Sequence, residues 1–129
     1  MSEISKKSWS AEQLKKFSTA DDMRISPFYS DGKTYGTPTW IWSVVVDDKL
    51  YVRAWNGQNS CWYQSAVQQR AGRMNLASAN FEISFKDVAD PSLINKVDDA
   101  YREKYAGSAY LSPMIQDGPK STTLNIIPR

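Results

Sequence analysis

The segment from Trp40 to Met74 constrains the fold of this chain more than any other part of the sequence. It opens with a run of β-branched and aromatic residues at 40–46, and a second such run follows at 50–55. Both runs have the composition of β-strands. The polar residues between them, 47–49, predict a tight turn, so the two strands are expected to form an antiparallel hairpin.

A loop and a short helix are predicted to follow this hairpin. Gly57 lies in a polar segment that turns the chain, and Ser60 is placed to cap a helix that extends to about Gln69. Gly72 is the expected stop of that helix. Local signals alone therefore predict the order strand, turn, strand, glycine-containing loop and helix.

Charge in this part of the chain has one sign. From Lys49 to Phe81 the sequence has four basic residues and no acidic residue, a local charge of +4 against +2 for the whole chain. The four are Lys49, Arg53, Arg70 and Arg73. Because the N–H groups and the dipole at a helix N-terminus favour anions, this segment predicts a site for an anionic, planar ligand.

The N-terminal part of the chain carries a helix-start signal. Ser10 and Gln13 have the spacing of a capping box, and Trp9 and Leu14 fit the hydrophobic staple around it. The predicted helix ends near Ser18, and a helix of that length is stable only when it packs against the rest of the protein.

Further strands and one long helix complete the expected elements. The remaining predicted strands are 22–28, 74–76, 81–85 and 122–127. Residues 78–80 are the expected turn of a second hairpin between 74–76 and 81–85. Asp90 and Pro91 occupy the N-cap and first position of the longest helix, which is expected to end near Gly107. The sequence thus predicts one α+β domain over 1–129, with about six mostly antiparallel strands and two or three flanking helices. A small barrel capped by helices is the most economical arrangement of these elements.

Composition excludes several classes of function. The chain has 129 residues, 16 basic and 14 acidic, and this near balance argues against a nucleic-acid-binding protein. It has no histidine and one cysteine, so neither a Ser-His-Asp triad nor a Cys/His zinc site is possible, and we expect no metal. We also expect no membrane partner, because no apolar run is long enough to cross a bilayer, and a cytoplasmic location, because of the single cysteine and the absence of a signal-peptide pattern.

Each candidate binding residue in the central segment also has an ordinary structural interpretation. Arg53 is expected in the second strand on the face of Tyr51 and Trp55, where it either lines a cavity or is solvated. Ser60 and Trp62 stand at the predicted helix start, where Ser60 is either part of an anion site or a simple N-cap.

Two other groups of candidates are less specific. Arg70 and Arg73 flank the end of the short helix and also fit the usual favourable charge at a helix C-terminus. On the long helix, Tyr101 and Lys104 have a spacing that is first of all a packing pattern. The adjacent carboxylates Asp98 and Asp99 are expected on a solvated helix face.

Several motifs together resemble the bacterial family known as domain of unknown function 2255. They are Asp22-Met23-Arg24-Ile25-Ser26-Pro27, Trp42-Ser43-Val44-Val45, Leu50-Tyr51-Val52-Arg53, Gly57-x-x-Ser60-x-Trp62-Tyr63, Gly72-Arg73-Met74, Ala100-Tyr101-Arg102-Glu103-Lys104-Tyr105, Thr122-Thr123-Leu124 and Pro128-Arg129. The resemblance covers the chain from about Trp9 to its C-terminus.

More distantly, the pattern is similar to the split β-barrels that bind FMN or deazaflavin, including deazaflavin-dependent nitroreductases. This resemblance implies a split barrel and a flavin- or deazaflavin-binding oxidoreductase-like protein of unknown substrate, with no catalytic residue assigned. The residues expected at the cofactor are Arg53, Trp55, Gly57, Ser60, Trp62, Arg70, Arg73, Tyr101 and Lys104. Neutral residues beside the glycine loop, such as Gln58 and Asn59, leave fewer phosphate-binding charges than a flavin site usually has.

Two alternatives stay open at this point. One is a non-enzymatic binding module for a small aromatic or anionic metabolite, and the other is a stability or interaction protein without a ligand. A homodimer is also expected, because split barrels leave part of the sheet uncovered and the chain is rich in aromatic residues.

Overall fold

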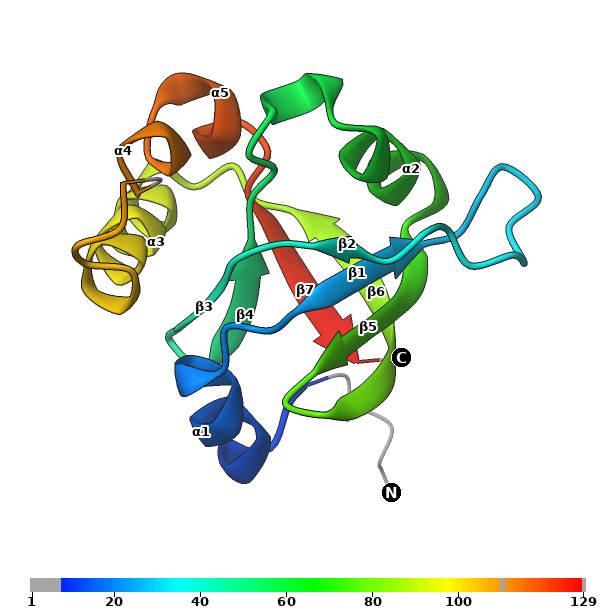
Figure 1. The fold of residues 1–129 in the computed structure, drawn as a ribbon, viewed down its shortest axis with the longest axis horizontal. Helices are drawn as coiled ribbons and strands as arrows, with labels where there is room; N and C mark the ends of the chain where they lie inside the picture. Colours follow the sequence, from blue (N-terminus) through cyan, green and yellow to red (C-terminus); the bar gives the residue numbers. More distant parts are fainter. Residues whose placement is uncertain (1–7, 110, 129) are drawn as a thin grey trace.

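A computed structural model describes residues 8–109 and 111–128, and its strands form one curled sheet (Figure 1). In the described residues seven strands are ordered β2-β1-β5-β6-β7-β4-β3, and every neighbouring pair is antiparallel. Their bounds are β1 Arg24–Pro27, β2 Thr39–Trp40, β3 Ser43–Val46, β4 Lys49–Val52, β5 Ala71–Leu76, β6 Ala79–Asp87 and β7 Leu124–Pro128. The sheet is a half-barrel, so the predicted α+β split-barrel class is confirmed.

The two edge strands of the sheet, β2 and β3, follow one another in the chain. β2 pairs with β1 at one edge and β3 pairs with β4 at the other, and only Ile41 and Trp42 connect them. The prediction of one continuous strand at 40–46 is therefore wrong. A strand cannot pair at both edges of a sheet at once, so the chain leaves the sheet at Ile41 and crosses the open side of the half-barrel.

Both predicted hairpins have two-residue turns with positive φ. Asp47 and Asp48 connect β3 to β4 with φ of 50° and 65°, and Ala77 and Ser78 connect β5 to β6 with φ of 53° and 66°. Two consecutive left-handed residues match the right-handed twist of the flanking strands. The second turn lies slightly earlier than the sequence indicates, because β6 is longer than its apolar run.

Helices cover the ends and one side of the sheet (Figure 1). Their bounds are α1 Ala11–Thr19, the 3₁₀ helix η2 Gly57–Asn59, α2 Cys61–Gln69, α3 Pro91–Lys104, α4 Leu111–Met114 and α5 Asp117–Lys120. The Ser10–Gln13 capping box is present at α1, and the Asp90 side chain accepts a hydrogen bond from the Ser92 N–H at α3. The structure thus has more helices than the expected two or three, because two short turns near the C-terminus are also helical.

Gly72 does not stop a helix as predicted. α2 ends instead at Arg70, which adopts the left-handed conformation with φ of 60°. Gly72 lies in β5, where a Cβ atom would stand 2.5 Å from the Ser26 carbonyl oxygen of β1. The glycine is therefore required by the close approach of two backbones rather than by a turn.

The sheet has apolar residues buried on both faces. Residues of β4 alternate between two clusters: Leu50 and Val52 pack inside the half-barrel with α1 and α2, whereas Tyr51 packs on the outside against α3. Five helices on a half-barrel can cover both faces of a strand in this way. No helix in residues 8–109 or 111–128 is both long and apolar enough to span a membrane.

Candidate functional site

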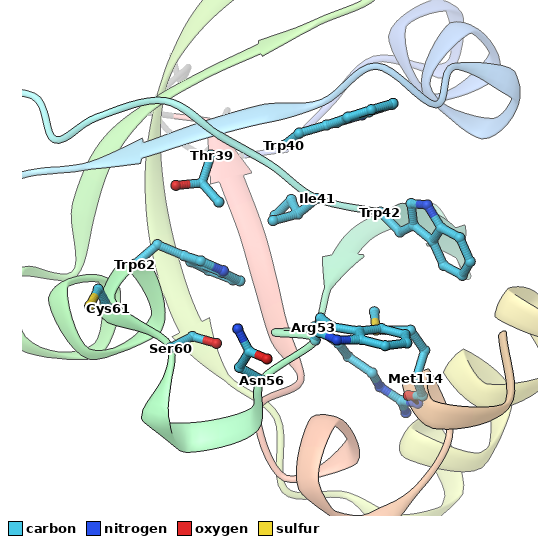
Figure 2. Close-up of a pocket in the computed structure, with 11 residues that line it drawn as sticks. Thr39, Trp40, Ile41, Trp42, Arg53, Asn56, Ser60, Cys61, Trp62 and Met114 are labelled. Atoms are coloured by element: carbon cyan, nitrogen blue, oxygen red, sulfur yellow. Dashed lines mark hydrogen bonds between the residues drawn. The ribbon is translucent and has the colours of Figure 1, made fainter. Parts of the chain in front are cut away.

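A cavity of about 490 Å³ opens where the two edges of the half-barrel meet (Figure 2). Its walls come from β2 and its connection to β3, from the segment between β4 and α2 together with the start of α2, and from α4. The lining residues are Thr39, Trp40, Ile41, Trp42, Arg53, Trp55, Asn56, Ser60, Cys61, Trp62 and Met114. A cavity of this size accommodates a small-molecule ligand.

Four of the five tryptophans in the chain line this cavity. The Trp62 ring is almost buried and points into the space between Ile41 and Asn56 (Figure 2). Trp42 is held by a parallel stack on Tyr105, with ring centroids 3.9 Å apart and planes within 3°. Trp40 and Trp55 are exposed at the rim. Large flat surfaces of this kind favour a planar ligand that stacks.

The N-terminus of α2 reaches the same cavity. Ser60 is the N-cap residue, but its side chain makes no capping hydrogen bond, and its hydroxyl points toward Asn56 in Figure 2. The first N–H groups of any helix lack partners within the helix. Gly57 brings the chain to this position with φ of 68°, and a Cβ atom there would stand 3.4 Å from the backbone of Gly118.

Arg53 lies at the inner end of the cavity and is fully buried. It follows β4 rather than lying within the strand, so the predicted mid-strand position is wrong. Its Nε donates to Thr123 Oγ1 at 2.9 Å, and its two terminal nitrogens donate to the carbonyl oxygens of Met114 and Ile94, each at 3.2 Å. It also forms an ion pair with Asp98. The guanidinium is thus a crosslink between β4, α3, α4 and the start of β7.

The prediction that Asp98 lies on a solvated helix face is wrong. Asp98 is 4% exposed, and its second carboxylate oxygen pairs with Lys120 Nζ of α5 at 3.1 Å. Asp99 is exposed and pairs with Arg102, as expected for a solvated position. The periodicity of α3 alone does not show that α4 and α5 cover the Asp98 side of the helix.

Arg70 and Arg73 do not reach the cavity. Arg70 pairs with Asp87 on the surface, and this hydrogen-bonded carboxylate raises the pKa of Arg70. The Arg73 guanidinium carbon lies 3.9 Å from the centroid of the Tyr35 ring, and Arg73 does not line the cavity. The segment without acidic residues therefore does not form a single basic surface. Asp98 pairs with Arg53 and Asp87 pairs with Arg70, and both carboxylates come from other segments of the chain.

Tyr101 and Lys104 are structural in their immediate contacts. Tyr101 is fully buried, which raises the pKa of its phenol, and its hydroxyl donates to the Trp42 carbonyl at 3.2 Å. Lys104 Nζ donates to the carbonyl oxygens of Phe17, Ala20 and Ser43 at 3.2, 2.6 and 2.7 Å. Burial lowers the pKa of Lys104 to about 8. Neither residue lines the cavity, but both bond to the backbone of Trp42 or Ser43 beside it.

Of the nine residues expected at a ligand, the structure brings four to the cavity lining: Arg53, Trp55, Ser60 and Trp62. Gly57 shapes the approach to it. The lining residues not singled out from the sequence include Thr39, Trp40, Ile41, Asn56 and Met114. The pair of tryptophans around Ile41 is a usable signal in the sequence, although it also fits the regular strand that the pattern predicts. Nothing local in the sequence indicates Met114, which tertiary packing alone brings near Arg53.

Few of the described residues that line the cavity have side chains that could act as acids, bases or metal ligands. Arg53 is the one ionisable side chain, apart from the Cys61 thiol, among the described residues that line the cavity. Residues 8–109 and 111–128 contain no cluster of three or more histidine, cysteine, aspartate or glutamate residues that could hold a metal ion. The other polar side chains among the described lining residues are the hydroxyls of Thr39 and Ser60 and the amide of Asn56.

Comparison with known proteins identifies a family and a fold. Residues 13–126 match the family described as "Uncharacterized protein conserved in bacteria (DUF2255)". No curated protein matches the sequence. Among solved structures, the chain is similar to the conserved hypothetical protein Rv2991 from Mycobacterium tuberculosis, with a TM-score of 0.63 and 16% identity over 98% of this chain and 84% of the other. At this identity the likeness concerns the fold alone.

Proposed function

The chain belongs to the DUF2255 family of bacterial proteins, and we propose that it binds a planar, aromatic small molecule with an anionic or polar end, of the flavin or deazaflavin class. The observation that carries this proposal is the gathering of four tryptophans around one cavity of about 490 Å³, beside the N-terminus of α2.

The cavity suits the ring system of such a ligand. Trp62 presents a nearly buried ring, and Trp42 is fixed by its stack on Tyr105, so neither ring loses much freedom when a ligand stacks on it. Trp55 at the rim adds an exposed apolar surface. Aromatic stacking on tryptophan contributes roughly 1–3 kcal/mol per ring in other binding sites.

The cavity suits a phosphate less well than it suits a ring. The Ser60 hydroxyl and the N-terminal N–H groups of α2 offer neutral donors to an anion. Arg53 adds a positive charge, but Asp98 already pairs with it, and its donors bond to Thr123 and to two carbonyl groups. Arg70 and Arg73 have no part in this proposal, since both lie away from the cavity.

The chemistry of the proposed complex would come from the ligand. A bound flavin or deazaflavin supplies electron or hydride transfer. The tryptophans would orient its ring and exclude water from one face, and Ser60 with the start of α2 would fix its polar end.

A non-enzymatic binding module for a small aromatic or anionic metabolite is the second candidate. It is favoured by one observation: the lining offers no carboxylate and no free base among the described residues. Such a cavity can hold an aromatic compound without taking part in a reaction.

Titration by tryptophan fluorescence and calorimetry tests the proposal. FMN, a deazaflavin cofactor and a set of neutral aromatic compounds are titrated into the wild-type protein and into Trp62→Leu. We expect binding of a flavin-type compound, weakened in Trp62→Leu by roughly 1–3 kcal/mol because one stacking surface is lost. Trp9→Phe is the matched control, since Trp9 is the tryptophan outside the cavity.

The result separates the two candidates. Binding of FMN or the deazaflavin, followed by reduction and reoxidation of the bound compound, supports an oxidoreductase-like protein. Binding of a neutral aromatic compound alone supports the metabolite module. If neither cofactor binds below about millimolar concentration, the flavin proposal is wrong.

We also propose a second copy of the chain as a partner. Trp40 and Trp55 at the cavity rim are 66% and 43% exposed, and a subunit seated over them would cover this apolar surface. The single cysteine is consistent with the cytoplasm as the compartment in which the protein works.

A further inference from the structure

A second, smaller cavity adjoins the tryptophan cavity. It has a volume of about 160 Å³ and lies between α2 and the loop that leads from β1 to β2. Thr39, Cys61 and Trp62 line both cavities, so the base of the Trp62 side chain is the wall between them. In Figure 2 the Thr39 hydroxyl and the Cys61 thiol point away from Arg53 and Met114.

The chemistry of the second cavity differs from that of the first. Four hydroxyl-bearing side chains contribute to its lining, and no described lining residue is charged: the four are Tyr29, Thr37, Thr39 and Ser65. Tyr29 and Thr37 already bond to each other at 3.1 Å, which fixes their oxygens. The Tyr29 hydroxyl also accepts from the Thr37 N–H at 3.2 Å, and the Thr39 hydroxyl donates to the Thr37 carbonyl at 3.3 Å. Because a hydroxyl has two acceptor sites besides its one donor, the Thr39 hydroxyl can still accept a bond from a ligand hydroxyl.

We infer that the ligand of the tryptophan cavity carries an uncharged, hydroxyl-bearing arm, such as a polyol or a sugar, and that this arm lies over Trp62 in the second cavity. This inference rests on the proposed binding of a planar ring. Neutral hydroxyls recognise neutral hydroxyls without the desolvation cost of a charge. A carboxylate or phosphate at the end of the arm would meet no cation among the described lining residues, so the inference favours a neutral ligand of the flavin class, such as riboflavin, over FMN.

The inference is tested with two compounds that share one ring system. Lumiflavin has a methyl group where riboflavin has a ribityl chain, and neither carries a phosphate. We expect riboflavin to bind the wild-type protein about tenfold more tightly than lumiflavin, the equivalent of one or two hydrogen bonds. Ser65→Leu fills the second cavity from α2, and it should remove this preference while the affinity for lumiflavin stays unchanged.

Gln68→Leu is the matched control. Gln68 lies on the same helix, is exposed and lines neither cavity, so this variant should keep the riboflavin preference. The wild-type protein provides a second measurement that needs no variant. Cys61 is the one cysteine of the chain and lines both cavities, so its rate of alkylation by iodoacetamide reports on their occupancy. Saturating riboflavin should slow this alkylation more than saturating lumiflavin.

The outcomes distinguish the inference from the proposed function. Equal affinities for the two compounds in the wild type, or a preference that persists in Ser65→Leu, would overturn the inference and leave ring binding intact. Equal protection of Cys61 by both compounds would also count against it. If lumiflavin and riboflavin both fail to bind, the binding of a flavin-type ring fails, and the inference fails with it.

Discussion

At the scale of single residues, Arg53 is among the largest fully buried side chains of the described residues. An unpaired guanidinium in a protein interior would be strongly unfavourable. Here Asp98 provides the counter-charge, while Thr123 and two carbonyl groups accept its hydrogen bonds. Lys120 pairs with the other oxygen of Asp98. Asp98 therefore connects α3 both to α5, through Lys120, and to the end of β4, through Arg53.

We predict that Asp98→Asn lowers the free energy of unfolding by about 3–5 kcal/mol, because it leaves Arg53 buried without a counter-charge. Asp99→Asn is the matched control on the same helix. Its carboxylate is exposed and pairs with Arg102, so the change should cost less than about 1 kcal/mol. Urea denaturation of both variants measures the difference. Equal effects would show that the Arg53–Asp98 pair is not a major contribution to stability.

Tyr105 gives a prediction for alkaline pH. Burial raises its pKa to about 12 from an ordinary value of 10.0. The folded state therefore keeps a proton that the unfolded state loses, and the stability that this contributes is complete below pH 10 and is lost as pH rises toward 12. The wild type should lose stability in this range more steeply than Tyr105→Phe, by up to about 1.4 kcal/mol per pH unit.

Unfolding in urea at pH 9 to 12 measures these slopes. Tyr101 is also buried with a raised pKa, so Tyr105→Phe should keep part of the decline. Tyr29→Phe is the control, because Tyr29 is 47% exposed. A slope in Tyr105→Phe equal to that of the wild type would contradict the prediction.

At the scale of elements, α1 is attached to the body by contacts at both of its ends. Before its start, Trp9 Nε1 donates to the Ile126 carbonyl at 2.8 Å, and the Trp9 ring makes edge contacts with Phe17 and Phe81. At its end, Lys104 Nζ donates to the Phe17 and Ala20 carbonyl oxygens. A helix of nine residues is marginal in isolation, so these contacts account for its presence.

Trp9→Ala is expected to lower the free energy of unfolding by about 3 kcal/mol or more, since it removes a buried ring and leaves a cavity. Ser10→Ala should cost only about 1 kcal/mol, because it removes one capping hydrogen bond at an exposed position. Thermal and urea denaturation compare the two variants. Two neutral results would mean that α1 does not dock as described.

At the scale of the whole molecule, the open side of the half-barrel is where we expect a ligand and a partner to bind. β2 and β3 form opposite edges of the sheet, and the chain crosses between them through Ile41 and Trp42. This crossing leaves the tryptophan cavity beside two exposed rings, Trp40 and Trp55. Apolar surface of this kind commonly marks an interface.

We therefore predict a homodimer, with a mass by light scattering of twice the chain mass of 14.6 kDa at micromolar concentration. Trp40→Ser should shift the equilibrium toward monomer, because it removes the large ring that is most exposed among the described residues. Lys33→Ser, in an exposed loop, should leave the mass unchanged. A monomer at all concentrations of the wild type would rule out the predicted assembly.

The sequence by itself determined the local elements, because their signals act over a few residues. The Ser10–Gln13 capping box, the Asp90 cap and the turn at Asp47 and Asp48 all appear where hydrogen-bonding capacity and chain polarity place them. The same kind of information predicted Ser60 and Trp62 at a helix start, and both residues line the cavity.

Only the tertiary structure decided which residues meet across long separations. The expected continuous strand at 40–46 is divided at Ile41 and Trp42, because Trp40 pairs with β1 at one edge of the sheet and β3 pairs with β4 at the other. Asp98 became the partner of Arg53, and Arg70 that of Asp87, because chain segments distant in sequence packed together. A charge in a sequence has no fixed partner, since its electrostatic environment depends on burial and on groups that folding brings within a few ångströms.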